Sequence, residues 1–236
     1  MAGEKRPLGR ALGTIATDLL LAAIAAGLFL ALNASGRRAL AVSAGAGFGT
    51  VYRGSSENGA ALVCVVSWDA SACGAILDTL REHGAAMTFA VSAGFAEKNP
   101  ELLQRICAEG HEIALCCGTG EQKGPEAVKK ELSRAALLVE KSCGARPAAF
   151  ILGGDTDRAA CRAARALGLA LVAGSRDLVC LRGTADDIAA RAKLVRGGDI
   201  ALCAPTASFS AALPAILEYY SLMGLTAAPL SGTIYD

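Results

Sequence analysis

Five side chains that could bind a metal ion or a sugar follow apolar runs predicted to be strands: Trp68, Asp69, Cys116, Asp155 and Asp177. The carboxyl ends of parallel strands share one edge of a sheet, and functional residues gather at that edge. A thiolate with two carboxylates could hold a divalent metal ion. An exposed indole could also stack on the apolar face of a sugar ring. The pattern therefore admits a metal-dependent or sugar-binding site.

The same side chains have a purely structural interpretation. The aspartates can cap the helices that follow them, and a cysteine in an apolar run is typical of a small buried side chain. A nucleophilic thiol would need a neighbouring base. His83 is expected at a helix C-terminus and His111 at the start of a strand. Both positions are away from the carboxyl ends of the strands. Without a neighbouring base, the only chemical role left for the adjacent thiols of Cys116 and Cys117 is a redox role.

A regular alternation of strands and helices must position these residues. Apolar runs of strand length alternate with segments whose apolar residues recur at helical spacing. The expected strands are 60–66, 87–92, 112–115, 148–152, 170–173, 199–203 and 225–228, and the expected helices are 72–83, 100–110, 125–143, 157–167, 185–195 and 208–223. This alternation predicts an α/β fold with a parallel sheet and right-handed crossovers, either doubly wound or closed into a barrel.

Residues 96–115 carry the most specific pattern in the chain. Asn99 suits an N-cap, Pro100 suits the first helical turn, and Gly110 suits the end of the helix before the next strand. The segment AEKNPELLQRICAEGHEI resembles the residues before the second motif of polysaccharide deacetylases, the NodB-homology family or carbohydrate esterase family 4. The resemblance covers about residues 60–231 and implies an irregular (β/α)7-type barrel.

The first family motif supports two alignments. Ser67-Trp68 is similar to the sporulation-associated branch of the family, and this match places Val65 at the position of the catalytic aspartate. A slipped alignment would instead place Asp69 at that position, with Trp68 in place of the family's phenylalanine. We favour the first alignment because it preserves the Ser-Trp pair.

The other family motifs keep their framework and lose their polar residues. Cys116 and Gly120 stand where the resemblance implies two metal-ligating histidines. Ile151 stands at the arginine of the third motif, and Ala204 at the histidine of the fifth. Family enzymes use a divalent metal such as zinc, a carboxylate base and a histidine acid to hydrolyse an N-acetyl group. Because these ligands and proton carriers are missing, we expect no metal cofactor and no deacetylase activity.

The expected function is therefore a polysaccharide deacetylase-like binding module of the cell envelope. Its partner would be cell-wall glycan such as peptidoglycan, or an envelope protein. The alternative is an active carbohydrate (N-acetyl sugar) deacetylase or other hydrolase with a site rebuilt from Asp69, Cys116, Asp155 and Asp177. A formal net charge of +1 gives no electrostatic support for a nucleic-acid partner.

The N-terminal part of the chain predicts a membrane attachment. Residues 11–32 are apolar except for Asp18, and a helix of that length covers about 30 Å, enough to span a bilayer. A signal peptide cleaved after residue 41 is the alternative, although Arg37 and Arg38 argue against it. We expect a short tail over 1–10, a transmembrane anchor over 11–32, a flexible linker over 33–59, and an extracytoplasmic deacetylase-like domain over 60–236.

Nine cysteines are unusual for an exported domain. Several lie in apolar runs, namely Cys64, Cys107, Cys180 and Cys203, and no CxxC motif or zinc-type spacing is present. We expect free, buried thiols rather than a disulfide framework.

Overall fold

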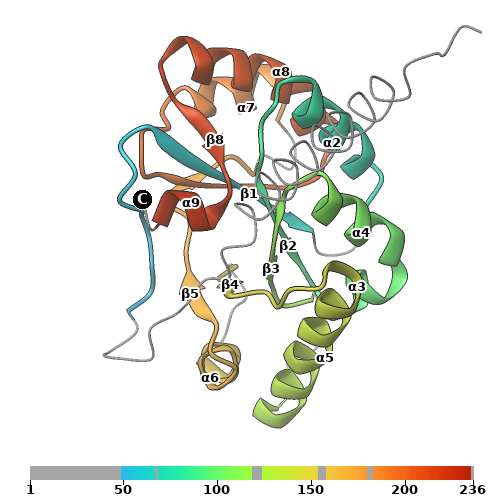
Figure 1. Ribbon diagram of the computed structural model, residues 1–236. Coiled ribbons are helices and arrows are strands. Elements are labelled where there is room, and N and C mark those ends of the chain that lie inside the picture. The colour runs from blue at the N-terminus through green and yellow to red at the C-terminus, as the bar shows by residue number, and fades with distance from the viewer. Residues whose placement is uncertain (1–48, 67–68, 119–123, 154–157, 180–182, 235–236) are drawn as a thin grey trace, which may run out of the picture. The chain divides into compact units, whose positions relative to one another are not determined.

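The computed structural model of the chain describes residues 49–66, 69–118, 124–153, 158–179 and 183–234 (Figure 1). Within these ranges the strands are β1 (Gly59–Val66), β2 (Thr88–Val91), β3 (Glu112–Leu115), β4 (Ala149–Ile151), β5 (Ala170–Val172), β6 (Arg176–Asp177), β7 (Ile200–Cys203) and β8 (Thr226–Ala228). The helices are α2 (Cys73–Glu82), α3 (Ala93–Lys98), α4 (Pro100–Ala108), α5 (Pro125–Cys143), α6 (Arg158–Ala166), α7 (Ala185–Ala192), α8 (Ala207–Leu222) and α9 (Leu230–Ile234). The expected alternation is confirmed, and β6, α3 and α9 are additional elements.

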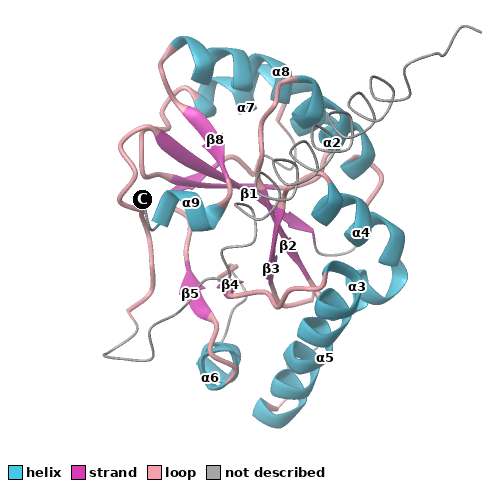
Figure 2. Ribbon diagram, viewed as in Figure 1, coloured by secondary structure: helices cyan, strands magenta, loops and turns pink. Residues whose placement is uncertain are grey.

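All strand pairs of the described sheet are parallel, and the strand order is β5-β4-β3-β2-β1-β7-β6, with β8 pairing to β1. Most helices are arranged around the outside of the strands (Figure 2). In the described part of the chain β5 and β6 end the order without pairing to each other. The sheet is therefore an open, curled half-barrel, and the expected closure into a (β/α)7-type barrel is not observed there.

Strand β1 shows why its sequence is apolar at every position. Ala60, Leu62, Cys64 and Val66 pack against the helices, whereas the alternate residues of the strand pack against the inner surface of the sheet. A strand covered on both faces gives a continuous apolar run instead of an alternating one. We call the apolar residues on the inner surface the inner cluster: Val51, Ala61, Val63, Val65, Ala90, Ala114, Cys116, Ala149, Ile151, Val172, Ile200, Leu202, Leu230 and Ile234.

Helix α9 covers the inner cluster at the edge where the strands begin. The hydroxyl of Thr88, at the start of β2, accepts the N–H of Leu230 at 2.8 Å. The carboxylate of Glu112, at the start of β3, accepts the N–H of Ser231 at 2.9 Å. Burial raises the pKa of Glu112, and these hydrogen bonds oppose the rise. Leu230 is fully buried among the inner residues. We call this edge the amino edge of the sheet, and the opposite one the carboxyl edge.

Residues 49–58 belong to the folded domain, which corrects the expected flexible linker over its described part. The N–H of Val51 donates to Leu171 at 2.8 Å and that of Gly54 donates to Gly198 at 2.7 Å. Val51 also forms a bridge with Val172 of β5. Composition predicted a linker because Gly and Ser are frequent here, but the backbone hydrogen bonds that order the segment come from residues more than a hundred positions away.

Gly197→Ala is expected to lower the free energy of unfolding by about 3 kcal/mol, because an added Cβ would overlap the backbone carbonyl of Glu57. A backbone atom cannot rotate away as a side chain can. Gly94→Ala is the matched control, since its Cβ would enter open space in helix α3. That substitution is expected to change stability by less than about 1 kcal/mol, in the favourable direction. Denaturant unfolding of the two variants checks this; equal losses would contradict the packing of residue 57 on residue 197.

None of the helices in the described ranges is long and apolar enough to cross a membrane. The expected anchor, residues 11–32, lies outside those ranges. Its assignment stays a prediction from the sequence.

The cysteines contradict one expectation. Cys107 in α4 and Cys143 at the end of α5 form a disulfide, with Cα atoms 5.7 Å apart. The expectation of free thiols alone is therefore wrong for this pair, because the packing of α4 on α5 brings together two residues 36 positions apart. Other described cysteines, among them Cys64 and Cys203, are buried and free, as expected. Cys180 lies outside the described residues.

Candidate functional site

The carboxyl edge of the sheet carries the positions that the resemblance aligns with catalytic residues. Val65 lies at the end of β1, Ile151 ends β4, and Ala204 follows β7 directly. Val65 and Ile151 pack in the inner cluster together with Leu202. The side chains at these positions are hydrocarbons, so they cannot coordinate a metal ion or carry a proton.

Cys116 follows β3 and points into the same cluster. Its side chain is nearly inaccessible to solvent, and its Sγ donates to the carbonyl oxygen of Ala90 at 3.4 Å. Burial raises the pKa of this thiol to about 12. A metal ion is bound by the thiolate, and this environment keeps the thiol protonated. Cys116 therefore behaves as a small buried side chain.

Asp69 and Asp177 shape the loops that contain them. Oδ1 of Asp69 accepts the N–H of Ser71 at 2.9 Å, and Oδ1 of Asp177 accepts the N–H of Val179 at 2.7 Å. Both carboxylates are solvent-exposed and make the local turn that aspartate commonly makes with the backbone two residues on. The hydrogen bond from Ser71 lowers the pKa of Asp69. The other two predicted site residues, Trp68 and Asp155, lie outside the described ranges.

The zinc ion that the resemblance implies does not fit the residues present. No group of three or more His, Cys, Asp or Glu side chains among the described residues is arranged to hold a metal ion. Of the two positions aligned with metal-ligating histidines, one is the protonated Cys116 thiol and the other is Gly120, which has no side chain. The residues at the aligned positions therefore form an apolar surface and supply no metal ligands.

The framework around the lost acid position is retained. Thr206 caps helix α8, because its Oγ1 accepts the N–H of Phe209 at 3.1 Å. Its own N–H donates to the carbonyl oxygen of Ala204 at 2.8 Å. The Ala204-Pro205-Thr206 turn therefore joins β7 to α8 with a satisfied backbone while the functional side chain at its first residue is absent.

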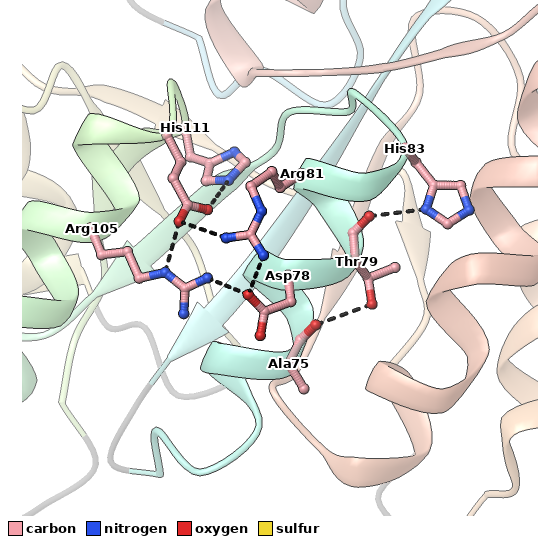
Figure 3. Close-up of polar contacts among 8 residues, drawn as sticks. Ala75, Asp78, Thr79, Arg81, His83, Arg105 and His111 are labelled. Atoms are coloured by element: carbon pink, nitrogen blue, oxygen red, sulfur yellow. Dashed lines mark hydrogen bonds and ion pairs between the residues drawn. The ribbon is translucent and has the colours of Figure 1, made fainter.

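His111 lies at the amino edge, immediately before β3, as expected for a structural residue. Its ring packs against Phe89 with centroids 5.7 Å apart, and neither ring nitrogen has a hydrogen-bond partner. Nε2 lies 3.9 Å from Glu109. Figure 3 shows the neighbouring network, in which Arg105 donates to Glu109 and to Asp78, each at 2.7 Å. This cluster ties α2 to α4 and has no link to the carboxyl edge.

The buried His111 is expected to make stability fall in mild acid. Burial lowers the pKa of His111 below its usual 6.5, and this effect outweighs the attraction of Glu109. The unfolded chain therefore takes up a proton at a higher pH than the folded chain, so the free energy of unfolding decreases as the pH falls through 6.5. In His111→Phe the free energy of unfolding is expected to decrease less on acidification. In His83→Gln, a substitution at an exposed position, it should decrease as much as in the unchanged chain. Unfolding at pH 7.5 and 5.5 measures both; equal decreases in the three proteins would contradict the assignment.

A pocket of about 410 Å³ lies at the amino edge, and no sequence motif predicted it. Its lining residues come from three separate segments: Arg53, Glu57 and Asn58; Arg196 and Gly197; and Tyr219, Met223 and Leu225. Asn58, Gly197 and Leu225 stand shortly before β1, β7 and β8. No local motif connects these residues, so only the fold could reveal them.

Comparison with known proteins agrees with the geometry. The family model for polysaccharide deacetylase matches residues 63–172. A carbohydrate esterase family 4 pseudoenzyme from Bacillus anthracis superposes with a TM-score of 0.73 at 17% identity, covering 80% of this chain and 69% of that one. A peptidoglycan N-acetylglucosamine deacetylase superposes with a TM-score of 0.72 at 20% identity, covering 78% and 92%. A family 4 carbohydrate esterase from Streptomyces lividans gives 0.67 at 21% identity, covering 73% and 93%. Residues 63–172 of the chain therefore match the polysaccharide deacetylase family, and the fold of the domain is that of the carbohydrate esterase family 4 structures.

Proposed function

We propose that this chain is a membrane-anchored polysaccharide deacetylase-like protein that has no deacetylase activity and binds cell-envelope glycan or an envelope protein. One observation carries the proposal. The positions aligned with the family's base and third-motif arginine, Val65 and Ile151, are part of the apolar inner cluster. The domain keeps the fold, and apolar side chains that pack in the inner cluster occupy the aligned catalytic positions.

The loss affects every step of the family reaction. Val65 cannot accept a proton from water, and Ala204 cannot protonate a leaving amine. Cys116 keeps its proton because of burial. No group in the aligned set is left to activate water or to stabilise the departing nitrogen.

Two relatives support the direction of this proposal. The Bacillus anthracis protein is a family pseudoenzyme, and a mutant of it has restored enzymatic activity. Another neighbour is a peptidoglycan deacetylase from Bacillus subtilis, with a TM-score of 0.66 at 19% identity. By analogy we propose an N-acetylated envelope glycan, such as peptidoglycan, as the first ligand to test, with an envelope protein as the alternative partner.

Location at the outer side of a membrane follows from two separate features. The apolar run 11–32 is long enough to span a bilayer. The disulfide between Cys107 and Cys143 suits an oxidising compartment, in which such bonds persist. We therefore propose a single-pass anchor with the domain in the extracytoplasmic space.

The alternative, an active hydrolase with a rebuilt site, has less support. It requires Asp69, Cys116, Asp155 and Asp177 to act together. The carboxylates of Asp69 and Asp177 are engaged in turns, and the thiol of Cys116 is buried. These contacts explain the three described residues without a metal.

Metal analysis and glycan binding of the full chain in mild detergent test the proposal. After exposure to zinc, cobalt and manganese we expect no stoichiometric metal, no release of acetate from N-acetylglucosamine oligomers, and co-sedimentation with insoluble peptidoglycan. Stoichiometric metal that disappears in Cys116→Ala or Asp69→Ala, but persists in the control Cys161→Ala, would overturn the inactive assignment and support the rebuilt site. Failure to bind both peptidoglycan and envelope extracts would overturn the binding role.

A further inference from the structure

Large apolar side chains gather at the amino edge of the domain. Five such side chains are strongly exposed in the described part of the chain: Tyr52, Leu137, Leu194, Leu222 and Met223. All except Leu137 line the amino-edge pocket or lie within two residues of one that does. Leu222 is 85% exposed. Single exposed apolar residues are common on protein surfaces, but a group around one pocket indicates an interaction site.

Cations accompany these apolar side chains. Arg53 and Arg196 line the pocket and are exposed, against Glu57 as the one carboxylate of the lining. The Lys193 ammonium lies 5.8 Å from the ring centroid of Tyr219. One guanidinium nitrogen of Arg53 donates to Gly197 at 2.7 Å and another lies 3.4 Å from Asp199, yet 54% of the side chain is exposed. We call the group formed by Tyr52, Arg53, Lys193, Leu194, Arg196, Leu222 and Met223 the basal face.

The basal face lies where the chain enters the domain. The described part begins at residue 49, three positions before Tyr52. Helices α7 and α8 lie side by side (Figure 1); Leu194 follows the end of α7, and Leu222 is the last residue of α8. Only residues 33–48 separate the apolar run 11–32 from this entry point, and a segment of that length reaches at most about 55 Å. A tether this short keeps the local lipid concentration at the domain high.

We propose that the basal face binds the surface of an anionic lipid bilayer. Leu194, Leu222 and Met223 would enter the headgroup region, and the guanidinium and ammonium groups would pair with lipid phosphates. Exposed aliphatic side chains beside Arg and Lys are the signature of interfacial attachment. The carboxyl edge, with Val65 and Ala204, then faces away from the membrane and toward the envelope. This inference rests on the membrane anchor of the proposed function.

Lipid quenching of a single tryptophan tests the orientation. The full chain carrying Trp68→Phe is reconstituted into vesicles of phosphatidylcholine, with or without about one-third phosphatidylglycerol, that carry brominated acyl chains. Leu222→Trp reports on the basal face. Leu137→Trp is the matched control, because Leu137 is an exposed leucine on α5. We expect at least about twofold stronger quenching at position 222 than at 137 in anionic vesicles, since interfacial side chains reach about 5–10 Å into the lipid.

Measurements in salt and by vesicle flotation distinguish the hypothesis of a membrane anchor from the hypothesis of a lipid-binding basal face. Quenching at position 222 should be weaker in neutral vesicles, which lack net negative surface charge, and in about 0.5 M NaCl, which screens the attraction to anionic lipids. Vesicle flotation with equal quenching at the two positions would keep the anchor and overturn the basal face. Absence of flotation would overturn the anchor and the inference together. A dimer in detergent that Leu222→Glu dissociates, with unchanged quenching, would identify the face as a contact between copies and overturn its lipid assignment.

Discussion

Cys116→His combined with Gly120→His is expected to introduce zinc binding at saturating zinc concentration, whereas the unchanged chain should bind none. The two positions stand where the resemblance implies metal-ligating histidines, and the strand before them is paired in the parallel sheet: Leu115 ends β3 and pairs with Phe150 of β4. Adding Val65→Asp and Ala204→His supplies a base and an acid at the aligned positions. Deacetylation of N-acetylglucosamine oligomers is expected only when all four substitutions are present.

The matched control is Cys116→Asn with Gly120→Asn, which adds polarity without a good zinc ligand. Both double variants place a larger side chain where a nearly inaccessible thiol now lies, so each should lose a similar amount of stability, about 1–3 kcal/mol. Zinc content by elemental analysis then separates coordination from the cost of the substitution. A folded histidine variant that binds no zinc would show that the carboxyl edge no longer has the family geometry.

The proposed loss of the polar site is compatible with retention of the fold. Buried polar and charged groups at catalytic sites reduce stability unless every one has its partners. In this chain the corresponding positions add Val65 and Ile151 to the inner cluster. In the proposed function these residues contribute packing in place of catalytic groups. A protein selected for binding rather than for turnover would accumulate such changes without losing its fold.

The sequence predicted those elements whose boundaries are local. Helix α5 runs over Pro125–Cys143 as expected, because proline fits its first turn and Gly144, at φ +70°, ends it. Strand β1 was predicted within one residue because a strand buried on both faces is apolar throughout. The assignment of catalytic positions rests on short contiguous motifs and stays a prediction from the sequence.

The missed features depend on long-range contacts. Strand β6 has only two residues, Arg176 and Asp177, which are polar because the strand lies at the sheet edge. Helix α9 contains a glycine and a threonine and is held by Thr88 and Glu112. The amino-edge pocket combines three segments, and the disulfide joins two helices. None of these has a periodic or motif signal that a single sequence could provide.

Replacing Cys107 and Cys143 together by serine is expected to lower the free energy of unfolding by about 3–4 kcal/mol. The disulfide closes a loop of 36 residues, and a loop of that length removes this much conformational freedom from the unfolded chain. The loop contains β3 and both aligned metal positions, Cys116 and Gly120, so the bond joins α4 to α5 on either side of the candidate site. Denaturant unfolding of the full chain in mild detergent measures the change.

Two comparisons make the disulfide prediction specific. Reductant should bring the unchanged chain to the stability of the double serine variant and leave that variant unaffected. Cys161→Ser, at a half-buried free thiol, should change the unfolding free energy by less than about 1 kcal/mol. If reductant leaves the unchanged chain as stable as before, the bond is not formed in the purified protein. The argument for an oxidising compartment would then fail, and the extracytoplasmic location would depend on the apolar run 11–32 alone.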